Sequence, residues 1–346
     1  MSCPPTLSGG CFFLQKKFID TCAALKIFDG VDKVLIAVSG GADSLALAEL
    51  LISSRQRFRL ELCIAHFNHN LRGQASDDDA AFVKNFAEQR GISFVGGHGD
   101  VKTFATENKI SIETAARILR YEFLSDVRQR LNCDAIVTAH HADDQAETIL
   151  FRLLRGATSA GLSAMQTRTV SDYGLILRPL LSFRKIALEN FCREKNLSPR
   201  VDATNFQPDA TRNKIRLELV PSLEKFNPAL VETLCRLGKV SADEADFINA
   251  QAEKIFPAVV QKSVVRGWII VRAEFLKLHP AIQRAVIKKF LVKATGTAKD
   301  FGFIHVEGIR KVLLNGLTGV ELPKKLQVKL TQGILYLTKN YHYGKG

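Results

Sequence analysis

The segment with the clearest chemical potential is a short loop of small and polar residues. It reads Ser39-Gly40-Gly41-Ala42-Asp43-Ser44 and lies between a strand-like apolar run and a helix-like one. Glycines let the backbone approach a ligand closely, and the start of a helix presents free N–H groups and a positive dipole end. Ser39 and Ser44 add hydroxyl donors. This pattern predicts a phosphate-binding turn.

Asp43 is unusual beside a phosphate, because a carboxylate repels a polyphosphate unless a divalent cation lies between them. The loop has neither the G-x-x-x-x-G-K-[ST] spacing of a P-loop nor the G-x-G-x-x-G spacing of a dinucleotide site. An ordinary strand-to-helix turn with Asp43 or Ser44 as the helix N-cap is the alternative. The local pattern leaves both interpretations open.

A second candidate block pairs two histidines with two aspartates. It reads His140-His141-Ala142-Asp143-Asp144 and opens a helix-like stripe. Adjacent aspartates suit Mg²⁺, which needs few protein oxygens and takes the rest from phosphates and water. Asp144 with Glu147 also resembles a capping box with Asp144 as the cap. A zinc site built from the two histidines and Asp144 is a further alternative, although no fourth ligand is in view.

Strand-like and helix-like segments alternate in the first part of the chain. The predicted strands cover residues 34–38, 60–66, 92–95 and 134–139, and the predicted helices cover 12–28, 45–51, 77–90, 111–130, 146–154 and 183–195. Such alternation predicts an α/β fold with a parallel, Rossmann-like sheet and helices on both faces. Ligands bind at the carboxyl ends of such strands. The glycine loop, His66 and the histidine–aspartate block should meet there.

The rest of the chain predicts a second, smaller domain. Residues 156–182 read as a loop, and Pro221 and Asn227-Pro228 mark a boundary. We therefore expect a catalytic domain at 1–220 and a mainly helical domain at 221–346 that ends in a small β element. Its expected elements are helices at 230–256, 281–293 and 305–314, a strand at 268–271, and hairpin strands at 326–330 and 334–337.

Composition narrows the class of protein. The chain has 346 residues, 46% hydrophobic content and a net charge of +13, which favours two globular domains and a polyanionic partner such as nucleic acid. No apolar run approaches the roughly 18 residues of a membrane span, and no secretory signal is visible at the start. Seven scattered cysteines without C-x-x-C spacing are typical of reduced thiols in a cytoplasmic protein.

Basic and amide side chains gather after the predicted sheet and suit contacts with phosphates and base edges. The candidates are Arg178, Arg184, Arg212, Asn213 and Arg216.

The loop Ser39 to Ser44 resembles the PP-loop of the N-type ATP pyrophosphatase family. Within that family, most of residues 30–220 resemble the tRNA(Ile)-lysidine synthases, whereas the second domain matches only loosely. The motifs that carry the resemblance are residues 65–72, Glu113-x-x-x-Arg117-x-x-Arg120-Tyr121, 140–148, 152–156, Arg178-Pro179-Leu180, and the segment from Asp202-x-Thr204-Asn205 to Arg212-Asn213-x-x-Arg216. Asn70 stands where glycine is commoner, which a turn tolerates.

The resemblance implies a specific ligase reaction. ATP adenylates O2 of the wobble cytidine, position 34, in the CAU anticodon of tRNA(Ile), and free L-lysine then attacks C2 to give lysidine. AMP and pyrophosphate are released, and codon reading changes from AUG to AUA. The implied ATP-binding residues are Ser39, Gly40, Gly41, Ala42, Asp43, Ser44 and His66.

The resemblance also implies roles for individual residues. Asp43, Asp143 and Asp144 would hold Mg²⁺, and Asp43, Asp144 and Arg120 would be catalytic. Arg117 is an alternative to Arg120 because residues three apart share a helix face.

The implied partners are tRNA(Ile), bound by the basic candidates and the second domain, and free lysine, with a homodimer as the suggested assembly. The rival interpretations are a tRNA thiolating enzyme on the same loop and a non-catalytic protein that binds ATP and tRNA.

Overall fold

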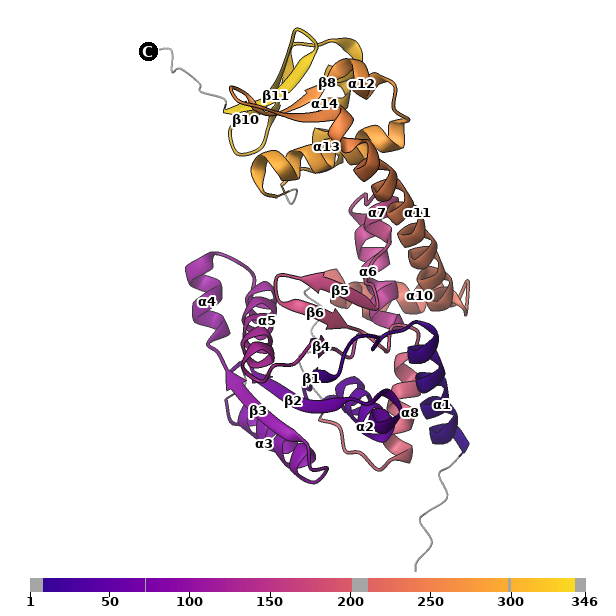
Figure 1. Cartoon of the computed structure of the whole chain (residues 1–346). Helices are drawn as coiled ribbons and strands as arrows, with labels where there is room; N and C mark the ends of the chain where they lie inside the picture. The colour runs from indigo at the N-terminus through magenta and orange to yellow at the C-terminus, as the bar shows by residue number, and fades with distance from the viewer. Residues whose placement is uncertain (1–8, 72, 201–210, 298–299, 340–346) are drawn as a thin grey trace, which may run out of the picture. The chain divides into compact units, whose positions relative to one another are not determined.

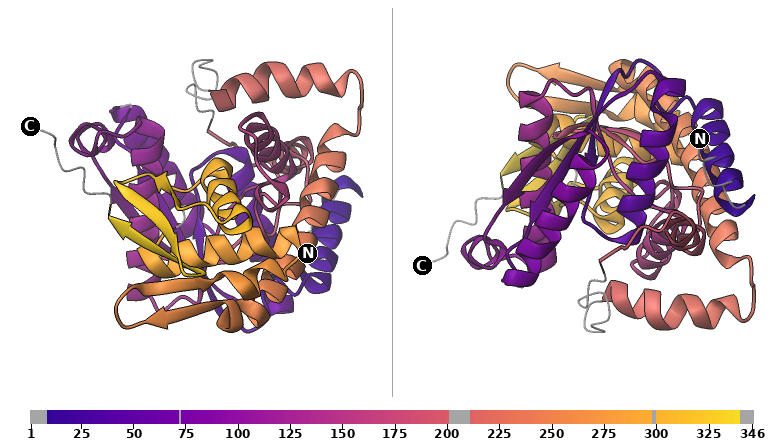
Figure 2. Two further views of the ribbon diagram at one scale, coloured as in Figure 1. Left: turned by 90° about the horizontal axis from the view of Figure 1, so that it is seen from above. Right: turned by 90° about the horizontal axis from the view of Figure 1, so that it is seen from below.

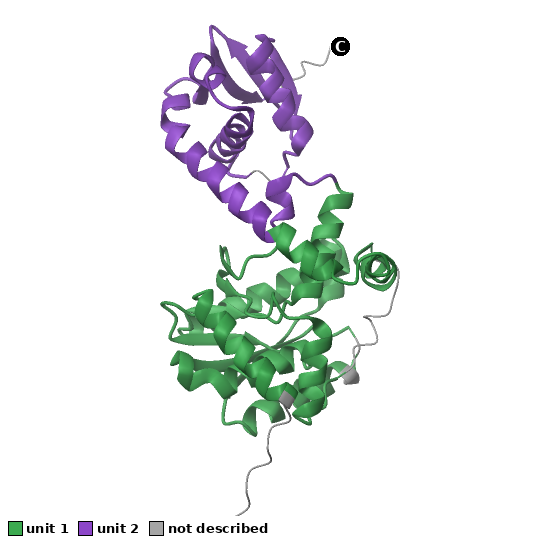
Figure 3. Cartoon of the chain, turned by 90° about the vertical axis from the view of Figure 1, so that its right-hand side faces the viewer, with its two compact units in different colours: residues 1–155, 164–238 green, residues 156–163, 239–346 purple. Residues whose placement is uncertain are grey.

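The computed structural model describes residues 9–71, 73–200, 211–297 and 300–339. The chain forms two compact units (Figure 3), of which unit 1 is Met1–Arg155 with Ala164–Gly238, and unit 2 is Gly156–Ser163 with Lys239–Gly346. The functional boundary expected after residue 220 stays a prediction. Within the described ranges, no helix combines the length and apolarity that a membrane crossing requires.

Unit 1 is built on a six-stranded sheet with the strand order β3-β2-β1-β4-β6-β5 (Figure 1). The five strands from β3 to β6 are parallel, and β5 runs antiparallel at the edge. The strands are β1 (Lys33–Ala37), β2 (Glu61–Asn68), β3 (Ser93–His98), β4 (Ala135–Val137), β5 (Arg168–Ser171) and β6 (Gly174–Leu177). The predicted α/β fold is confirmed.

Helices cover both faces of this sheet (Figures 1 and 2). The helices of unit 1 up to residue 194 are α1 (Gly9–Ala24), α2 (Ala42–Phe58), α3 (Gln74–Glu88), α4 (Val101–Asn108), α5 (Ile112–Arg130), α6 (Ala142–Leu154) and α8 (Lys185–Glu194). Alternate residues of β1 point to opposite layers. Val34 and Ile36 join the core made with α1, α2 and α8, whereas Leu35 packs with Leu124 and Val127 of α5.

The prediction of a loop over residues 156–182 is wrong. The segment contains α7 (Ser159–Leu162) and the hairpin of β5 and β6, and β6 pairs with β4 inside the main sheet. Four-residue strands carry almost no periodic signal, and the partner strand that buries Ile176 and Leu177 is about 40 residues away in sequence. The prediction also missed α4 for a similar reason, because an eight-residue helix gives only two turns of pattern.

Three short helical segments and one long helix follow in the chain. These are α9 (Thr211–Lys214), the π-helix η2 (Ile215–Leu219), α10 (Val220–Glu224) and α11 (Leu230–Val259). The first nine residues of α11 belong to unit 1, and the remainder belongs to unit 2.

Unit 2 has a fully antiparallel sheet with the strand order β7-β8-β11-β10-β9. Its elements are β7 (Val260–Ser263), β8 (Gly267–Val271), α12 (Arg272–Leu276), α13 (Pro280–Thr295), α14 (Phe303–Asn315), β9 (Gly319–Leu322), β10 (Leu326–Thr331) and β11 (Ile334–Lys339). Phe290 and Ile309 of the helices form one core with Val328 and Leu335 of the sheet. The predicted helices and hairpin are confirmed, and the β element is larger than expected.

Candidate active site

The glycine loop joins the end of β1 to the start of α2. Gly40 has φ +93°, a backbone conformation that residues other than glycine rarely adopt. Gly41 is the N-cap of α2, so the alternative with Asp43 or Ser44 as the cap is wrong. The Ser44 hydroxyl accepts from the Ser39 N–H at 3.1 Å and donates to the Gly41 carbonyl at 2.9 Å. The loop is thereby braced from inside, with the first turn of α2 directly behind it.

Asp43 lies in the first turn of α2, and its two carboxylate oxygens have different surroundings. Its Oδ2 is 3.5 Å from Nε2 of His141. Among the described residues, no group hydrogen-bonds to its Oδ1, although that atom is buried. A buried carboxylate oxygen without a partner is costly in a finished protein core. Such an atom indicates a place where a ligand or cation completes the site.

Helix α6 begins at the carboxyl end of β4 with a capping box whose cap is His141. Its Nδ1 accepts from the Asp144 N–H at 3.3 Å, and the Asp144 carboxylate accepts from the His141 N–H at 3.1 Å. The predicted capping box of Asp144 with Glu147 is therefore wrong by one turn, since Asp144 takes the role expected for Glu147. Because Nδ1 accepts this hydrogen bond, the neutral form of His141 carries its ring proton on Nε2.

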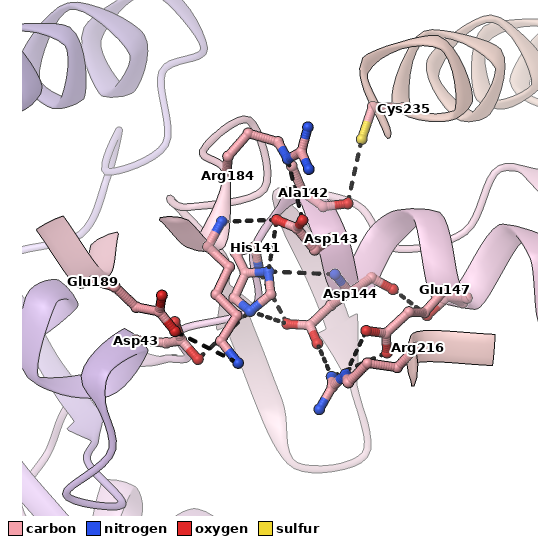
Figure 4. A network of polar contacts seen from close by, with 12 residues as sticks. Asp43, His141, Ala142, Asp143, Asp144, Glu147, Arg184, Glu189, Arg216 and Cys235 are labelled. Carbon is pink, nitrogen blue, oxygen red and sulfur yellow. Dashed lines mark hydrogen bonds and ion pairs between the residues drawn. The ribbon is translucent and has the colours of Figure 1, made fainter. Parts of the chain in front are cut away.

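The Nε2 edge of His141 faces two carboxylates from different elements (Figure 4). Asp43 Oδ2 and Asp144 Oδ2 are each 3.5 Å from this nitrogen. The histidine is 3% exposed, whereas the Asp43 side chain is 31% exposed, so the meeting point of the two acids is partly open to solvent. The structure therefore brings together two residues that lie about 100 positions apart in sequence.

Asp143 approaches the other ring nitrogen of His141, with Oδ2 3.6 Å from Nδ1, and its hydrogen bonds lead to α8 (Figure 4). Its Oδ1 accepts from Arg184 Nε at 3.1 Å, and its Oδ2 accepts from the Lys185 N–H at 2.7 Å. Arg184 also pairs with Glu224 of α10 and Glu232 of α11. Asp143 thus anchors the start of α6 to α8 and, through Arg184, to the base of α11.

The donor set fits a magnesium ion that is only partly held by protein. Asp43 offers a buried oxygen without a partner, and Asp144 approaches the same point from α6. The described residues contain no cluster of three or more metal-ligating side chains. A magnesium ion held by these two carboxylates would take its other oxygens from phosphates and water. Both oxygens of Asp143 have partners, and so do both oxygens of Asp144, which accept from the His141 N–H and from Arg216 Nη2. Among the described atoms of these three carboxylates, the buried oxygen without a partner is Asp43 Oδ1.

Three of the four arginines expected to contact nucleic acid, Arg184, Arg212 and Arg216, are paired with acids. Arg216 makes a two-pronged contact with Glu147, Nε to Oε1 at 2.6 Å and Nη2 to Oε2 at 3.0 Å. It also reaches Asp144 Oδ1 at 3.2 Å. Arg212 of α9 contacts Glu147 at 3.4 Å. Asn213 follows it in α9, and Arg216 lies in η2. Glu147 is 3% exposed, so these arginines balance a buried charge on α6.

Arg178 is an interior side chain with 7% exposure. Its Nη1 donates to the Gln166 carbonyl at 2.8 Å and to the Thr169 hydroxyl at 2.9 Å, both at the start of the β5–β6 hairpin. Among the described residues, no group pairs with its buried Nε. The motif residues Asp202, Thr204 and Asn205, and Arg72, lie outside the described residues.

A second charged neighbourhood surrounds His140. The guanidinium carbons of Arg117 and Arg120 lie 4.8 and 5.2 Å from the ring centroid of Tyr121. Burial lowers the pKa of His140 to about 3, and the positive charges of Arg120, Arg178 and Arg117 act in the same direction, although Asp144 opposes them. The Arg120 Nε is buried and has no partner in the described part of the chain. This side of the site is suited to an anion.

His141 has the opposite electrostatic setting. Burial alone would lower its pKa, but the contact with Asp43 and the charges of Asp144 and Asp143 raise the pKa above the usual value. The pKa of Asp144 is lowered despite its burial, because His141, His140 and Arg212 stabilise its charge. His66 lies below the loop with Nδ1 2.9 Å from the Val38 carbonyl, and burial lowers its pKa.

A family model described as a PP-loop domain matches residues 14–223 of this chain. The chain belongs to the PP-loop family. The matched region contains the whole loop, both histidines and the arginines of α9 and η2.

Two curated relatives of this PP-loop chain are named tRNA(Ile)-lysidine synthase. The protein from Clostridium acetobutylicum is 36% identical over 80% of this chain and 59% of its own length. The protein from Clostridium perfringens (strain ATCC 13124) is 34% identical over 94% of this chain and 67% of its own length. The chain thus spans about three fifths to two thirds of these relatives.

Among solved structures, the chain is similar to the U34-tRNA thiolase NcsA from Methanococcus maripaludis, which carries a [4Fe-4S] cluster. The TM-score is 0.57 at 17% identity, and the match covers 67% of this chain and 80% of the thiolase. At that identity the similarity establishes the PP-loop fold alone.

Sequence reasoning missed two features of this PP-loop site. Arg184 appeared only as a nucleic-acid candidate, whereas it links Asp143 to Glu224 and Glu232. His141 appeared as a zinc alternative, whereas it caps α6 and separates the two acids. The available signal was a polar side chain, His141, three residues before Asp144 at a helix start, since N-cap side chains accept from the N3 backbone.

Proposed function

We propose that this chain is an ATP-dependent ligase that joins free L-lysine to C2 of the wobble cytidine of tRNA(Ile) with a CAU anticodon. The observation that carries the proposal is the convergence of Asp43 and Asp144 on one point behind a PP-loop. The naming of relatives at 34–36% identity as tRNA(Ile)-lysidine synthase supports the substrate. The cytoplasm is the compartment that such a reaction implies.

The reaction proceeds in two displacements. The cytidine O2 attacks the α-phosphorus of ATP and forms an O–P bond, while the bond to pyrophosphate breaks. The lysine amine then attacks C2 and forms a C–N bond, while AMP leaves with O2 and the amine loses a proton. Each step needs negative charge to be stabilised on phosphate oxygens, which preorganised donors and cations achieve.

The residues around the loop supply these donors. Backbone N–H groups at Gly40, Gly41 and Ala42, together with the Ser39 and Ser44 hydroxyls, hold the departing pyrophosphate. Asp43 and Asp144 hold Mg²⁺, which neutralises developing phosphate charge when bound. Asp143 keeps the start of α6 in place through Arg184. Arg120, whose Nε has no partner in the described residues, stabilises the α-phosphate.

We place most of the electrostatic attraction for tRNA in unit 2. Residues 239–346 contain 18 lysines and arginines but only 8 aspartates and glutamates, whereas residues 1–238 contain 30 and 27. Ten of the thirteen net positive charges thus lie in the last third of the chain, as expected for a phosphate-binding surface. Contacts of Arg178, Arg184, Arg212, Asn213 and Arg216 with tRNA, and a homodimer, stay predictions.

A tRNA thiolating enzyme is the second candidate, because the thiolase shares this fold. Sulfur transfer needs reactive thiolates. Five of the six described cysteines are buried, and burial raises the pKa of Cys22, Cys133 and Cys192 to about 12. These thiols are inert at neutral pH, so the described residues favour the ligase.

ATP–pyrophosphate exchange tests the first displacement. With purified protein, Mg²⁺ and a tRNA(Ile) transcript, labelled pyrophosphate should enter ATP, and omission of the transcript should abolish the signal. Nucleotide binding without exchange would instead support a non-catalytic protein. Sulfur incorporation into the transcript would support the thiolase alternative.

A further inference from the structure

The hairpin of β7 and β8 in unit 2 ends in two valines that face solvent. Val264 is 104% exposed and Val265 is 90% exposed. Single exposed apolar residues are ordinary, but two consecutive, fully exposed valines at the tip of an edge hairpin are not. The candidate active site described above belongs to unit 1, so it does not involve this hairpin.

The hairpin is also entirely free of acidic residues. Residues 254–273, which include both strands, contain four lysines and arginines and no aspartate or glutamate. Two of these cations, Lys262 and Arg266, flank the valines. The tip therefore has an apolar end between two positive charges.

Two aromatic rings, Trp268 in β8 and Tyr336 in the neighbouring strand β11, each have a cation over them. The Arg266 guanidinium carbon lies 4.6 Å from the ring centroid of Tyr336, and Lys329 of β10 is opposite Tyr336 in the ladder. Lys293 Nζ lies 5.8 Å from the ring centroid of Trp268. Lys262 is directly opposite Trp268 in the ladder.

We infer that the β7–β8 hairpin is an RNA-contacting element that binds the phosphate backbone on either side of its valine tip. The rings are covered by cations, so they are not free to stack on bases. The cations, held in place by the rings, still present N–H groups to phosphate. This favours sequence-independent contact with a double-helical arm of RNA, whose wide and shallow minor groove admits a small apolar tip.

This inference rests on the proposed function in one respect, which is that RNA is the polyanion. An anionic membrane surface is the other partner that an apolar tip between cations could suit. The charge of unit 2 favours RNA, because its excess of ten positive charges extends over 108 residues rather than over one amphipathic helix.

The test places a carboxylate at the tip. Val265→Glu adds a negative charge to a fully exposed residue and leaves the fold intact. At about 0.1 M salt, it should weaken binding of a tRNA(Ile) transcript about tenfold in a filter-binding assay. The matched control is Val170→Glu on β5 of unit 1, which is 84% exposed and should change the dissociation constant less than about twofold. Equal effects of the two variants would overturn the inference.

A second pair of variants measures the phosphate contacts directly. Lys262→Gln with Arg266→Gln should reduce the slope of log K against log salt by about two. Lys311→Gln with Lys325→Gln removes the same charge elsewhere in unit 2 and should leave the slope nearly unchanged. A slope that falls equally in both doubles would contradict a localised contact.

Two arms separate this inference from its alternatives. Co-sedimentation with phosphatidylglycerol vesicles that is lost in Val265→Glu, with unchanged RNA binding, would replace RNA by a membrane and overturn the inference. The binding assays contain neither ATP nor lysine. A protein that binds tRNA through the hairpin yet forms no lysidine would therefore refute the proposed function and support this inference.

Discussion

His140 and His141 are adjacent in sequence but face opposite charges. His141 is turned to Asp43, Asp143 and Asp144, which raise its pKa, and it caps α6. His140 hydrogen-bonds the Thr138 hydroxyl at 2.9 Å and lies among arginines, and its pKa is about 3. These two consecutive residues thus lie in different halves of the site, His141 in an acidic half and His140 in a basic half.

The contrast suggests how one sheet edge can serve two ends of a triphosphate. The acidic half, beside the glycine loop, suits a cation and the pyrophosphate that it neutralises. The basic half, beside α5, suits the phosphate that is transferred. A neutral His140 next to Arg120 keeps that half from accumulating a further proton, so its charge stays constant over the physiological pH range.

The acidic half should be the more sensitive to loss of a single oxygen. Asp43→Asn preserves size but removes the carboxylate charge, and it should lower ATP–pyrophosphate exchange about a thousandfold. Binding of tRNA, measured by filter retention, should change less than about twofold, because the charge excess lies in unit 2. Asp29→Asn, at an exposed turn of unit 1, is the control. A collapse of tRNA binding in Asp43→Asn would show that the two surfaces are not separate.

The basic half should depend on Arg120 rather than on Arg117. Arg120 has a buried Nε without a partner in the described residues, whereas Arg117 is exposed. Arg120→Gln should reduce the maximal exchange rate about a hundredfold, the usual cost of one transition-state donor, with a smaller change in the ATP concentration for half-maximal rate. Arg117→Gln should cost less than about fivefold. The reverse ranking would assign the phosphate contact to Arg117.

The acidic half also needs internal counter-charges to remain folded. Arg216→Gln leaves Glu147, which is 3% exposed, with only Arg212 as a partner. We expect a loss of about 2 kcal/mol in the free energy of unfolding in urea. Arg212→Gln should cost less than about 1 kcal/mol, because that side chain is 38% exposed and makes the longer contact. Equal losses would mean that the two arginines share Glu147 evenly.

The two histidines should give opposite dependences of stability on pH when measured without metal. The folded-state pKa of His141 is raised, so its contribution is complete below the unfolded value near 6.5 and is lost as the pH rises through the folded pKa. The folded-state pKa of His140 is depressed to about 3, so its neutral form stabilises the fold above 6.5 and stability falls on acidification.

Each dependence has a limiting slope of about 1.4 kcal/mol per pH unit. In urea titrations from pH 5 to 8 with EDTA, His141→Gln should flatten the alkaline side of the stability profile. His140→Gln should flatten the acidic side. The same change in both variants would contradict the division of charge between the two residues.

Much of the fold could be predicted from residue patterns. The four strands from 34 to 139 and the helices after them were clear because each spans at least two periods of apolar alternation. The strands β5 and β6 were not, since their burial depends on pairing with β4 rather than on their own sequence. The antiparallel sheet of unit 2 exceeded the expected strand at 268–271 and hairpin because the four-residue strands β7 and β9 are too short to give a pattern.

The candidate site was predictable in position but not in detail. Strand order placed the glycine loop and residues 140–144 on one edge. The rotation that directs Asp144 toward Asp43 and Asp143 toward Arg184 depends on where α6 begins, and its cap is one turn earlier than the sequence suggested. The burial of Arg178 likewise depends on the unforeseen β5–β6 hairpin.

Incorporation of labelled lysine into tRNA tests the central claim most directly. Transcripts of tRNA(Ile) with a CAU anticodon and of tRNA(Met), which has the same anticodon sequence, are incubated side by side with the protein, ATP and Mg²⁺. We expect ATP-dependent incorporation into tRNA(Ile) only, at the wobble cytidine, and its loss in Asp43→Asn. If a protein preparation that is active in ATP–pyrophosphate exchange incorporated no lysine, the assignment of this site would be contradicted. Undiminished incorporation by Asp43→Asn would contradict it as well.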